Sequence, residues 1–268
     1  MKFENYLFCF FILLITSCDQ DDTISGNGLL KKSIVFVYGG QESTLLFKYN
    51  SNNTVSEIEI RDIAGTEDRK DIFYYNENDE ISFVETYRSE SNILVGITEF
   101  EYNNGLIVNQ RRESPSGDFA VEVIINYDNG DLTGYEICNT ENCSSGSYYD
   151  LSYSASGNNM VEKWFSSSIH SEDDDLLSMT EYEYDNAKNP FFGSNLSGQV
   201  FAYNSFYRIL PNENNFIKLE HENYDNNGDV RETFNQIITH TYNNNNQPLA
   251  SSCYQNDNLV WEIFYEYY

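Results

Sequence analysis

The sequence is poor in proline, which interrupts β-strands, and in methionine. It contains four prolines and three methionines among 268 residues, against 22 tyrosines and 18 phenylalanines. Aromatic side chains suit a pleated, half-buried surface, so this profile favours sheet over helix. No stretch after residue 30 combines a helical period of apolar residues with capping residues. We therefore expect an all-β fold.

Basic residues are scarce as well. Lysine and arginine number 15 against 43 aspartates and glutamates, which gives a net charge of −28. A negative field of this size repels phosphate backbones and anionic lipid surfaces, so we expect no nucleic-acid partner. The charge indicates solubility outside the cell, and divalent-cation binding by clustered carboxylates stays open as an alternative.

The sequence lacks the patterns that build catalytic or metal centres. It has three histidines, His170, His221 and His240, and no Gly-x-Ser-x-Gly turn that would present a nucleophile. His170 precedes an acidic run at residues 171–175, which we interpret as a solvated loop. We predict no catalytic residue, no metal site and no cofactor, and hence no enzyme. Paired carboxylates for glycoside hydrolysis stay open, because the 43 acids offer too many pairs to single one out.

Two acidic segments match only fragments of calcium-binding loops. They are residues 128–131 and 225–229, each with an aspartate at both ends. Neither has the full set of alternating ligands or the terminal bidentate glutamate. We predict Asx turns at both places.

The N-terminus has the features of a targeting segment. Lys2 is followed by an apolar run from Tyr6 to Ile15, which is too short to span a bilayer and typical of a signal peptide. The run ends in Ile-Thr-Ser before Cys18, which resembles the bacterial lipobox. The resemblance implies cleavage of residues 1–17 and lipid attachment at Cys18, where several acyl chains give a stable anchor. A plain secretory signal or a buried N-terminal strand is the alternative.

Residues 18–30 follow as a lipidated, flexible tether. Its Asp-Gln-Asp-Asp run resembles the surface-export signal of Bacteroidota-type lipoproteins, and a solvated spacer explains it equally well. We expect a lipid-anchored outer-membrane protein at the cell surface, with the periplasmic face as the alternative. The membrane is thus a partner through the anchor alone.

Three cysteines remain in the mature chain. Cys138 and Cys143 enclose four residues, and an oxidising compartment permits a disulfide at the tip of a hairpin there. A zinc site would need about four ligands, and none of the histidines lies beside the pair in the sequence. We predict the disulfide, which leaves Cys253 unpaired.

A repeat runs through the rest of the chain. Each copy is a short alternating strand that ends in Tyr, followed by Asn or Asp, a turn and a second strand. The eight marker tyrosines are Tyr49, Tyr75, Tyr102, Tyr127, Tyr153, Tyr184, Tyr224 and Tyr242. The first five are 25 to 27 residues apart, which fits two strands and two turns, and later gaps are 31, 40 and 18. The Asn-Gly and Asn-Asn turns tolerate the positive φ angles that tight hairpins demand.

This pattern resembles the YD-repeat (Rhs-like) hairpins. It is more similar still to uncharacterised Bacteroidota-type lipoproteins with tandem Tyr-Asp hairpins and a porin-like, curled antiparallel sheet. The segments that carry this resemblance are residues 184–193 (YDNAKNPFFG) and 210–215 (LPNENN). The resemblance covers roughly residues 31–268 and implies one all-β domain without an established activity. The long gap after Tyr184 predicts an excursion near residues 186–215.

We therefore expect an antiparallel meander of about 16–20 strands that curls into an open or closed barrel. A membrane-spanning porin is not expected, because acidic residues interrupt the face that would meet lipid. Two functional hypotheses follow. The first is a non-enzymatic lipoprotein that binds a ligand or protein partner, or serves as a scaffold. The second is a glycan-binding or glycan-processing surface component, which a concave cleft with Trp164 or Trp261 beside paired carboxylates would favour.

Overall fold

The computed structural model describes residues 28–37, 41–62, 64–88, 91–154, 157–166, 175–190 and 213–268. They form sixteen β-strands, at the lower end of the expected number. The strands are β1 (Leu30–Val37), β2 (Gln41–Tyr49), β3 (Val55–Asp62), β4 (Glu67–Tyr75), β5 (Ile81–Arg88), β6 (Ile93–Asn103), β7 (Leu106–Glu113), β8 (Phe119–Asp128), β9 (Asp131–Cys138), β10 (Gly146–Tyr153), β11 (Asn159–Phe165), β12 (Leu176–Lys188), β13 (Asn214–Tyr224), β14 (Val230–Tyr242), β15 (Pro248–Gln255) and β16 (Asn258–Tyr267).

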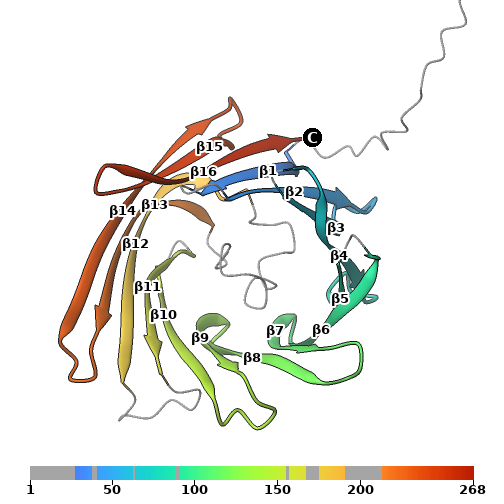
Figure 1. Cartoon of the computed structure of the whole chain (residues 1–268), viewed down its shortest axis with the longest axis horizontal. Helices are drawn as coiled ribbons and strands as arrows, with labels where there is room; N and C mark the ends of the chain where they lie inside the picture. Colours follow the sequence, from blue (N-terminus) through green and yellow to red (C-terminus); the bar gives the residue numbers. More distant parts are fainter. Residues whose placement is uncertain are drawn as a thin grey trace, which may run out of the picture.

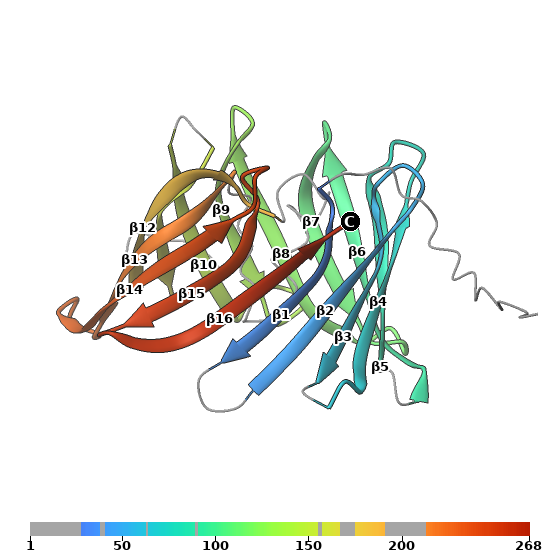
Figure 2. The ribbon, with the colours of Figure 1, turned by 90° about the horizontal axis from the view of Figure 1, so that it is seen from above.

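The strands form one closed antiparallel barrel. Each strand pairs with its neighbours in the sequence, and β1 pairs with β16 to close the ring (Figure 1). Seen from the side, the strands are inclined around the wall (Figure 2). The prediction of an all-β, barrel-like meander is confirmed, and the ring is closed rather than open. Closure removes the free sheet edges that invite aggregation. The predicted excursion lies largely in residues 191–212, outside the described residues.

The alternation of side chains along each strand assigns one set to the inside of the ring and one to the outside. Because the wall is a single sheet, most of the buried apolar side chains face inward. They form two clusters, one on β1–β5 and one on β7–β10. The buried members are Leu30, Leu45, Phe47, Val55, Phe73, Ile81 and Val84 in the first, and Ile107, Val123, Ile125, Leu132, Tyr135, Tyr149 and Leu151 in the second.

The repeated tyrosine has a structural role at one rim of the barrel. On five even-numbered strands its hydroxyl donates to the backbone carbonyl of the first residue of the preceding strand. These bonds run from Tyr49 to Leu30 (2.8 Å), Tyr75 to Val55 (2.6 Å), Tyr102 to Ile81 (3.1 Å), Tyr184 to Asn159 (2.6 Å) and Tyr267 to Pro248 (2.9 Å). We call this edge the tyrosine rim. The tyrosine stands just before its own hairpin turn, and the carbonyl that accepts its bond stands just after the neighbouring turn. Each bond therefore links two adjacent turns.

The Asn or Asp after the tyrosine holds its own turn. The side chain of Asn76 accepts hydrogen bonds from the backbone N–H groups of Asn78 and Glu80. Asn243 accepts in the same way from residues two and four positions later. The fourth turn residue has a positive φ, 59° at Asp79 and 60° at Asn246. The Tyr-Asn/Asp pair thus combines a bond to the neighbouring strand with a cap on the following turn.

Tyr224 does not belong to this repeat, although the sequence pattern placed it there. It ends β13, so its turn lies at the rim opposite the tyrosine rim. Its hydroxyl donates to the Glu222 carboxylate instead of to a neighbouring backbone. Tyr267 takes the eighth position, 25 residues after Tyr242. The long connection between β12 and β13 obscured the repeat, because it lengthened the spacing between successive marker tyrosines without changing the order of the strands.

Candidate functional site

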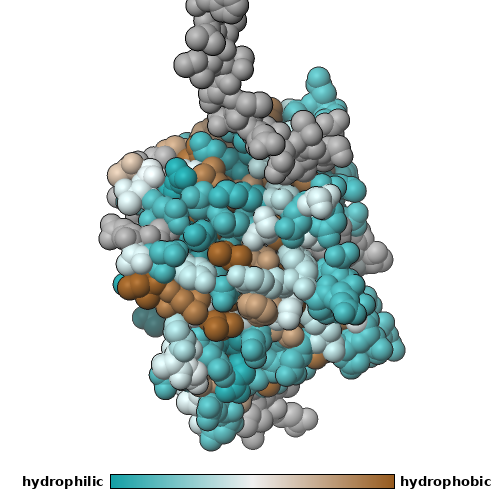
Figure 3. Space-filling model, turned by 90° about the vertical axis from the view of Figure 1, so that its right-hand side faces the viewer, coloured by the Kyte–Doolittle hydropathy of each residue, from teal (hydrophilic) through white to brown (hydrophobic). Residues whose placement is uncertain are grey.

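The outer face of the barrel is charged on strand after strand from β3 to β13. Outward positions alternate with the buried apolar positions, and strand register carries this assignment around the wall. The charged outward residues are Glu57, Glu59, Arg61, Lys70, Glu85, Glu99, Glu101, Arg111, Glu113, Glu122, Glu136, Asp150, Lys163, Glu181, Glu183, Lys218, Glu220 and Glu222. Figure 3 shows this predominantly hydrophilic surface on the side of β3–β6.

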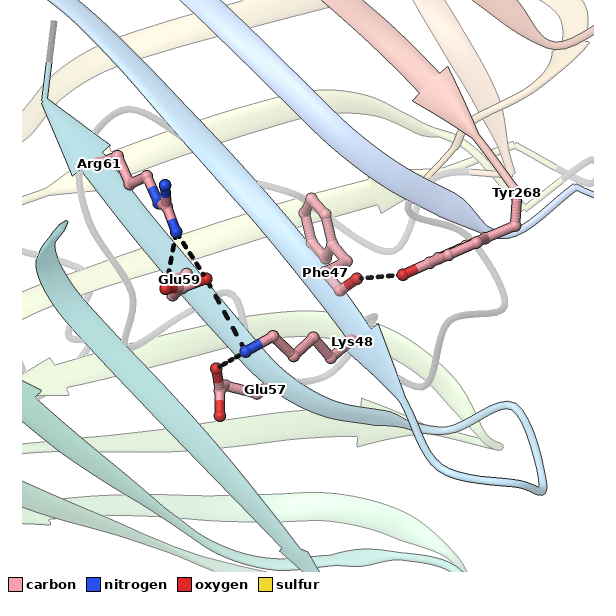
Figure 4. Close-up of polar contacts among 6 residues, drawn as sticks. All are labelled: Phe47, Lys48, Glu57, Glu59, Arg61 and Tyr268. Atoms are coloured by element: carbon pink, nitrogen blue, oxygen red, sulfur yellow. Dashed lines mark hydrogen bonds and ion pairs between the residues drawn. The ribbon is translucent and has the colours of Figure 1, made fainter. Parts of the chain in front are cut away.

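Cations on this face are shared between carboxylates. Lys48 Nζ lies 2.6 Å from Glu57 and 3.8 Å from Glu59, and Arg61 lies 3.1 Å from the same Glu59 (Figure 4). The side-chain hydrogen bond to Glu57 raises the pKa of Lys48. Lys218 lies 2.8 Å from both Glu183 and Glu220. Exposed pairs of this kind contribute little to stability, and their main effect is to reduce repulsion among the acids.

One sector of the outer face differs. Among the described residues, the outward positions of β14 and β15 between Thr233 and Tyr254 carry no charge. Ile237 and Tyr254 lie opposite each other there and are 47% and 36% exposed. Beyond β15, Phe264 on β16 packs edge to face against Phe36 on β1 at 5.7 Å. The described outward face of β14 and β15 is thus uncharged over this span, unlike that of β3–β13.

The inner face of β9–β11 carries a stack of three aromatic rings. Tyr135 stacks on Tyr149 with ring centroids 4.5 Å apart, and Tyr149 stacks on Trp164 at 6.1 Å. Both tyrosines are buried, whereas Trp164 is half-buried. The Trp164 Nε1–H is buried and has no hydrogen-bond partner among the described residues. Trp261 also faces inward but lies on β16, opposite Cys253 in the register.

Polar side chains continue this inner wall from β11 to β13. In the row beside Trp164, Glu162 lies opposite Thr180, which lies opposite His221. The Thr180 hydroxyl is 2.8 Å from His221 Nδ1, and His221 stacks on Phe234 of β14 at 4.6 Å. Glu162 is only 3% exposed. Aromatic rings beside a carboxylate and hydroxyls form a surface that can stack and hydrogen-bond a ligand.

A cleft of about 520 Å³ opens where β13 and β14 separate. Their pairing ends at Lys218 and Ile237, although β14 continues to Tyr242. The cleft is lined by Glu183, Asp185, Ile217, Lys218, Ile237, Ile238, Thr239, His240 and Tyr242. Tyr242 donates a hydrogen bond to the Asp185 carboxylate. Burial is the main cause of the raised pKa of Tyr242, and the hydrogen bond to Asp185 raises this pKa further.

Among the described residues, His240 and Ser251 are the pair that most resembles a catalytic dyad. His240 Nδ1 is 2.7 Å from the Ser251 hydroxyl, and Nε2 is 3.1 Å from the Phe216 carbonyl. The carbonyl can only accept, so the Nε2–H of His240 donates to it. Ser251 is 1% exposed, which hides its hydroxyl from a substrate. We therefore interpret the pair as a structural link between β14 and β15.

Cys138 and Cys143 form a disulfide with their Cα atoms 4.6 Å apart, at the turn between β9 and β10. The Glu136 carboxylate lies within 4.8 Å of both sulfur atoms. Sulfurs joined in a disulfide are not thiolates, so this group is a poor metal site. Cys253 is buried and free, and burial raises the pKa of its thiol to about 12.

The remaining sequence-predicted positions fall into two groups. At residues 225–229, Asp225 accepts backbone hydrogen bonds from Asn227 and Asp229, so this segment forms the Asx turn that was predicted. Residues 128–131 form a two-residue hairpin turn with positive φ at Asn129 and Gly130. Cys18, His170 and residues 191–212 lie outside the described residues.

The polar inner row of Glu162, Thr180 and His221 was not predicted from the sequence. These residues lie on three separate strands, 18 and 41 residues apart, and only the strand register brings them together. The only feature in the sequence that marks these residues is that each is polar at a strand position where the inward-facing residue is expected to be apolar. Many solvent-facing positions share that signal, so it could not single them out.

Within the described ranges, no helix reaches the length and apolar character that crossing a bilayer requires.

No protein-family model matches the sequence, and no curated protein matches it. Solved structures do match in fold. A porin-like protein from Bacteroides uniformis ATCC 8492 is 11% identical, with a TM-score of 0.57 over 91% of this chain and 99% of that one. A porin-like protein from Bacteroides vulgatus ATCC 8482 is 12% identical, with a TM-score of 0.51 over 90% and 99% of the two chains. At these identities the likeness concerns the fold alone, and the chain has a porin-like, all-β barrel fold.

Proposed function

We propose that this chain is a lipid-anchored barrel that stands in water beside the outer membrane and acts as a non-enzymatic binding or scaffold module. The observation that carries the proposal is the charged outer wall of β3–β13. A membrane-spanning barrel presents an apolar band to lipid and a polar interior. Here the polarity is reversed, with the charges outside and most of the buried apolar side chains inside. Cys18 supplies the attachment that such a barrel would need.

Fractionation of cells that express the full chain tests this proposal. Cys18→Ala removes the thiol that would carry the lipid, so the variant should move from the membrane fraction to the soluble fraction without detergent. Cys9→Ala is the matched control, because Cys9 lies inside the segment that would be cleaved and should leave the protein membrane-bound. If Cys18→Ala stays in the membrane and needs detergent for extraction, the barrel itself is held by lipid and the proposal is wrong.

A second candidate function is glycan binding on the inner wall. It is favoured by the ring stack of Tyr135, Tyr149 and Trp164 beside the carboxylate of Glu162. Sugars bind through stacking on ring faces and hydrogen bonds to polar groups at the ring edges. The buried, unpartnered Nε1–H of Trp164 is a donor that a hydroxyl could satisfy.

A glycan array probed with the purified full-length protein tests this candidate. Trp164→Ala should abolish any signal that depends on the ring stack. Trp261→Ala is the control, because Trp261 lies on β16, outside the stack. A signal that Trp164→Ala leaves unchanged would place the sugar elsewhere, and the absence of any signal would remove glycan binding from consideration.

A further inference from the structure

Three arginines gather on the inner face of β4–β7, near the rim opposite the tyrosine rim. Arg69 of β4 lies opposite Arg88 of β5 in the register. Arg112 of β7 lies opposite Thr98 of β6, which continues the row of Val84 and Phe73. Only seven arginines occur in the chain. Three of these arginines therefore lie close together inside a protein whose net charge is −28. Like charges repel one another, so this arrangement needs a physical explanation.

The Arg112 side chain packs over Gly96 of β6. A Cβ atom placed on Gly96 would come within 3.0 Å of Arg112 Nε and 3.1 Å of Nη2. The missing side chain therefore lets the guanidinium lie against the β6 backbone. Burial lowers the pKa of Arg112, repulsion from Arg69 lowers it further, and Asp71 opposes both effects. No residue of the described ranges forms a hydrogen bond or ion pair with this guanidinium.

Asp71 balances only part of the positive charge. It is fully buried, and its carboxylate lies 3.3 Å from Arg69 Nε. The inward positions of β5–β8 contain no other acidic residue among those described. One carboxylate thus faces two half-buried guanidinium groups, with the exposed Arg88 at the rim as a third cation. Arg112 thus shares the Asp71 carboxylate with Arg69.

Thr98 supplies an independent observation. It is 1% exposed, and its buried hydroxyl has no hydrogen-bond partner in the described part of the chain. Leaving a buried hydroxyl unpaired costs about 1–3 kcal/mol. Directly opposite residues in an antiparallel pair have Cβ atoms about 5 Å apart, so this hydroxyl lies beside the base of the Arg112 side chain. The Thr98 hydroxyl and the Arg112 guanidinium are thus two donors on neighbouring strands that one oxyanion could bind.

We propose that the inner face of β4–β7 is a binding site for an oxyanion, held by the Arg112 guanidinium with Arg69 and the Thr98 hydroxyl. Guanidinium groups match the planar geometry of carboxylates and the oxygens of phosphate and sulfate. The shared chemistry is an oxygen-bearing anion on a ligand that enters the barrel. The inference deepens the proposed binding function by naming the class of ligand. It does not depend on the lipid anchor or on the aromatic stack.

Isothermal titration of the purified full-length protein in a non-ionic detergent tests the site. Sodium sulfate, sodium phosphate and sodium glucuronate are titrated at constant ionic strength, and glucose is the uncharged control. Saturable binding of at least one anion, without binding of glucose, is expected. A preference for glucuronate identifies a carboxylate ligand, and a preference for sulfate or phosphate identifies an ester ligand. If none of the three anions binds saturably, the proposal is overturned.

Adjacent arginines provide a matched pair of variants. Arg112→Gln removes the inward guanidinium and should weaken anion binding by about tenfold or more. Arg111→Gln alters the next residue, whose side chain points outward and pairs with Glu113 at 2.7 Å, and should leave binding unchanged. Anion binding that Arg112→Gln retains at full strength would contradict the proposal.

Thr98→Val keeps the shape of the side chain and removes the hydroxyl. If the hydroxyl binds the ligand, the variant should fold normally and bind the preferred anion several-fold more weakly. If the hydroxyl is only an unpaired group in the core, the variant should gain stability and bind as the wild type does, which would count against the site. This variant also keeps the test decisive should Arg112→Gln fail to fold.

Discussion

The hydroxyl of the repeated tyrosine has a different environment in different hairpins. At Tyr49 it donates to the Leu30 carbonyl over 2.8 Å, whereas at Tyr153 it is buried without a partner among the described residues. Burial is the main cause of the raised pKa at both residues, which keeps the hydroxyl protonated and available as a donor. The aromatic ring is common to both positions, so the contribution of the hydrogen bond can be measured separately.

Replacing Tyr49 by Phe should lower the free energy of unfolding by about 1 kcal/mol, because the Leu30 carbonyl loses its partner. Tyr153→Phe should be neutral or stabilising, since it removes a buried hydroxyl that has no described acceptor. Urea denaturation of the two variants and the wild type measures the difference. Equal losses in both variants would show that the ring, and not the hydrogen bond, carries the effect.

Asp71 should make stability depend on pH in an unusual direction. Burial raises the pKa of Asp71 to about 6, although Arg69 opposes the rise. The unfolded chain releases this proton near pH 4, whereas the folded protein keeps it until about pH 6. Unfolding therefore releases a proton between these values, and raising the pH favours the unfolded state. The contribution of Asp71 is most favourable below pH 4 and is lost as the pH rises to about 6.

Comparison with Asp71→Asn isolates this effect. Between pH 4 and pH 7 the wild type should lose about 3 kcal/mol of stability relative to the variant. Asp225→Asn is a contrasting control, because backbone donors in its turn lower the pKa of Asp225 and its contribution is lost on acidification instead. Urea denaturation at several pH values gives both slopes. A wild-type advantage that grows with pH at Asp71 would contradict the prediction.

At the scale of the element, neighbouring strands approach closely at a glycine on β9. A Cβ atom on Gly134 would lie 2.4 Å from the backbone oxygen of Tyr149 on β10. Tyr149 is the central ring of the aromatic stack, so the spacing of β9 and β10 also positions the inner wall. The φ angle of Gly134 is not in the left-handed region, and it is the approach of the next strand that requires glycine here.

Gly134→Ala should destabilise the barrel by about 1–3 kcal/mol through overpacking against the β10 backbone. It should also disturb the stack, which near-ultraviolet circular dichroism would report as a changed aromatic signal. Gly65→Ala is the control, because Gly65 has open space around it and only a positive φ to accommodate. An unchanged aromatic signal in Gly134→Ala would show that the strands can separate without affecting the rings.

At the scale of the whole molecule, the first and last strands close the ring. The Tyr268 hydroxyl donates to the Phe47 carbonyl at 3.1 Å (Figure 4). The backbone N–H of Tyr268 donates to the Leu29 carbonyl. Lys31 lies 5.6 Å from the centroid of the Tyr268 ring. These contacts join residues more than 200 positions apart, so they form only when the whole chain has folded.

Deleting residues 258–268 should leave β1 and β15 as free edges. Open edges pair with other chains, so the truncated protein should aggregate or form oligomers, which size-exclusion chromatography with light scattering would detect. Deleting Tyr268 alone should leave β16 in place and preserve the monomer with a lower thermal midpoint. A monomeric, equally stable protein without residues 258–268 would mean that closure contributes nothing to this fold.

The features that depend on neighbours along the chain could be predicted from the residues alone. Alternating aromatics predicted strands, Asn and Asp residues predicted the turns that they cap, and the spacing of tyrosines predicted hairpins that end near them. Each of these follows from the geometry of a few consecutive residues. The same reasoning misplaced Tyr224, because a repeat count cannot detect that a strand runs toward the other rim.

Which residues lie together across the wall depends on how the strands pair in three dimensions. Closure of the ring, the meeting of Trp164 with Tyr149, and the position of Arg112 opposite Thr98 all depend on strand register. Register is set by the sum of many cross-strand contacts, and a shift of one residue would turn every side chain to the opposite face. No short segment contains that information, so the inner surface could be described only once all sixteen strands were in place.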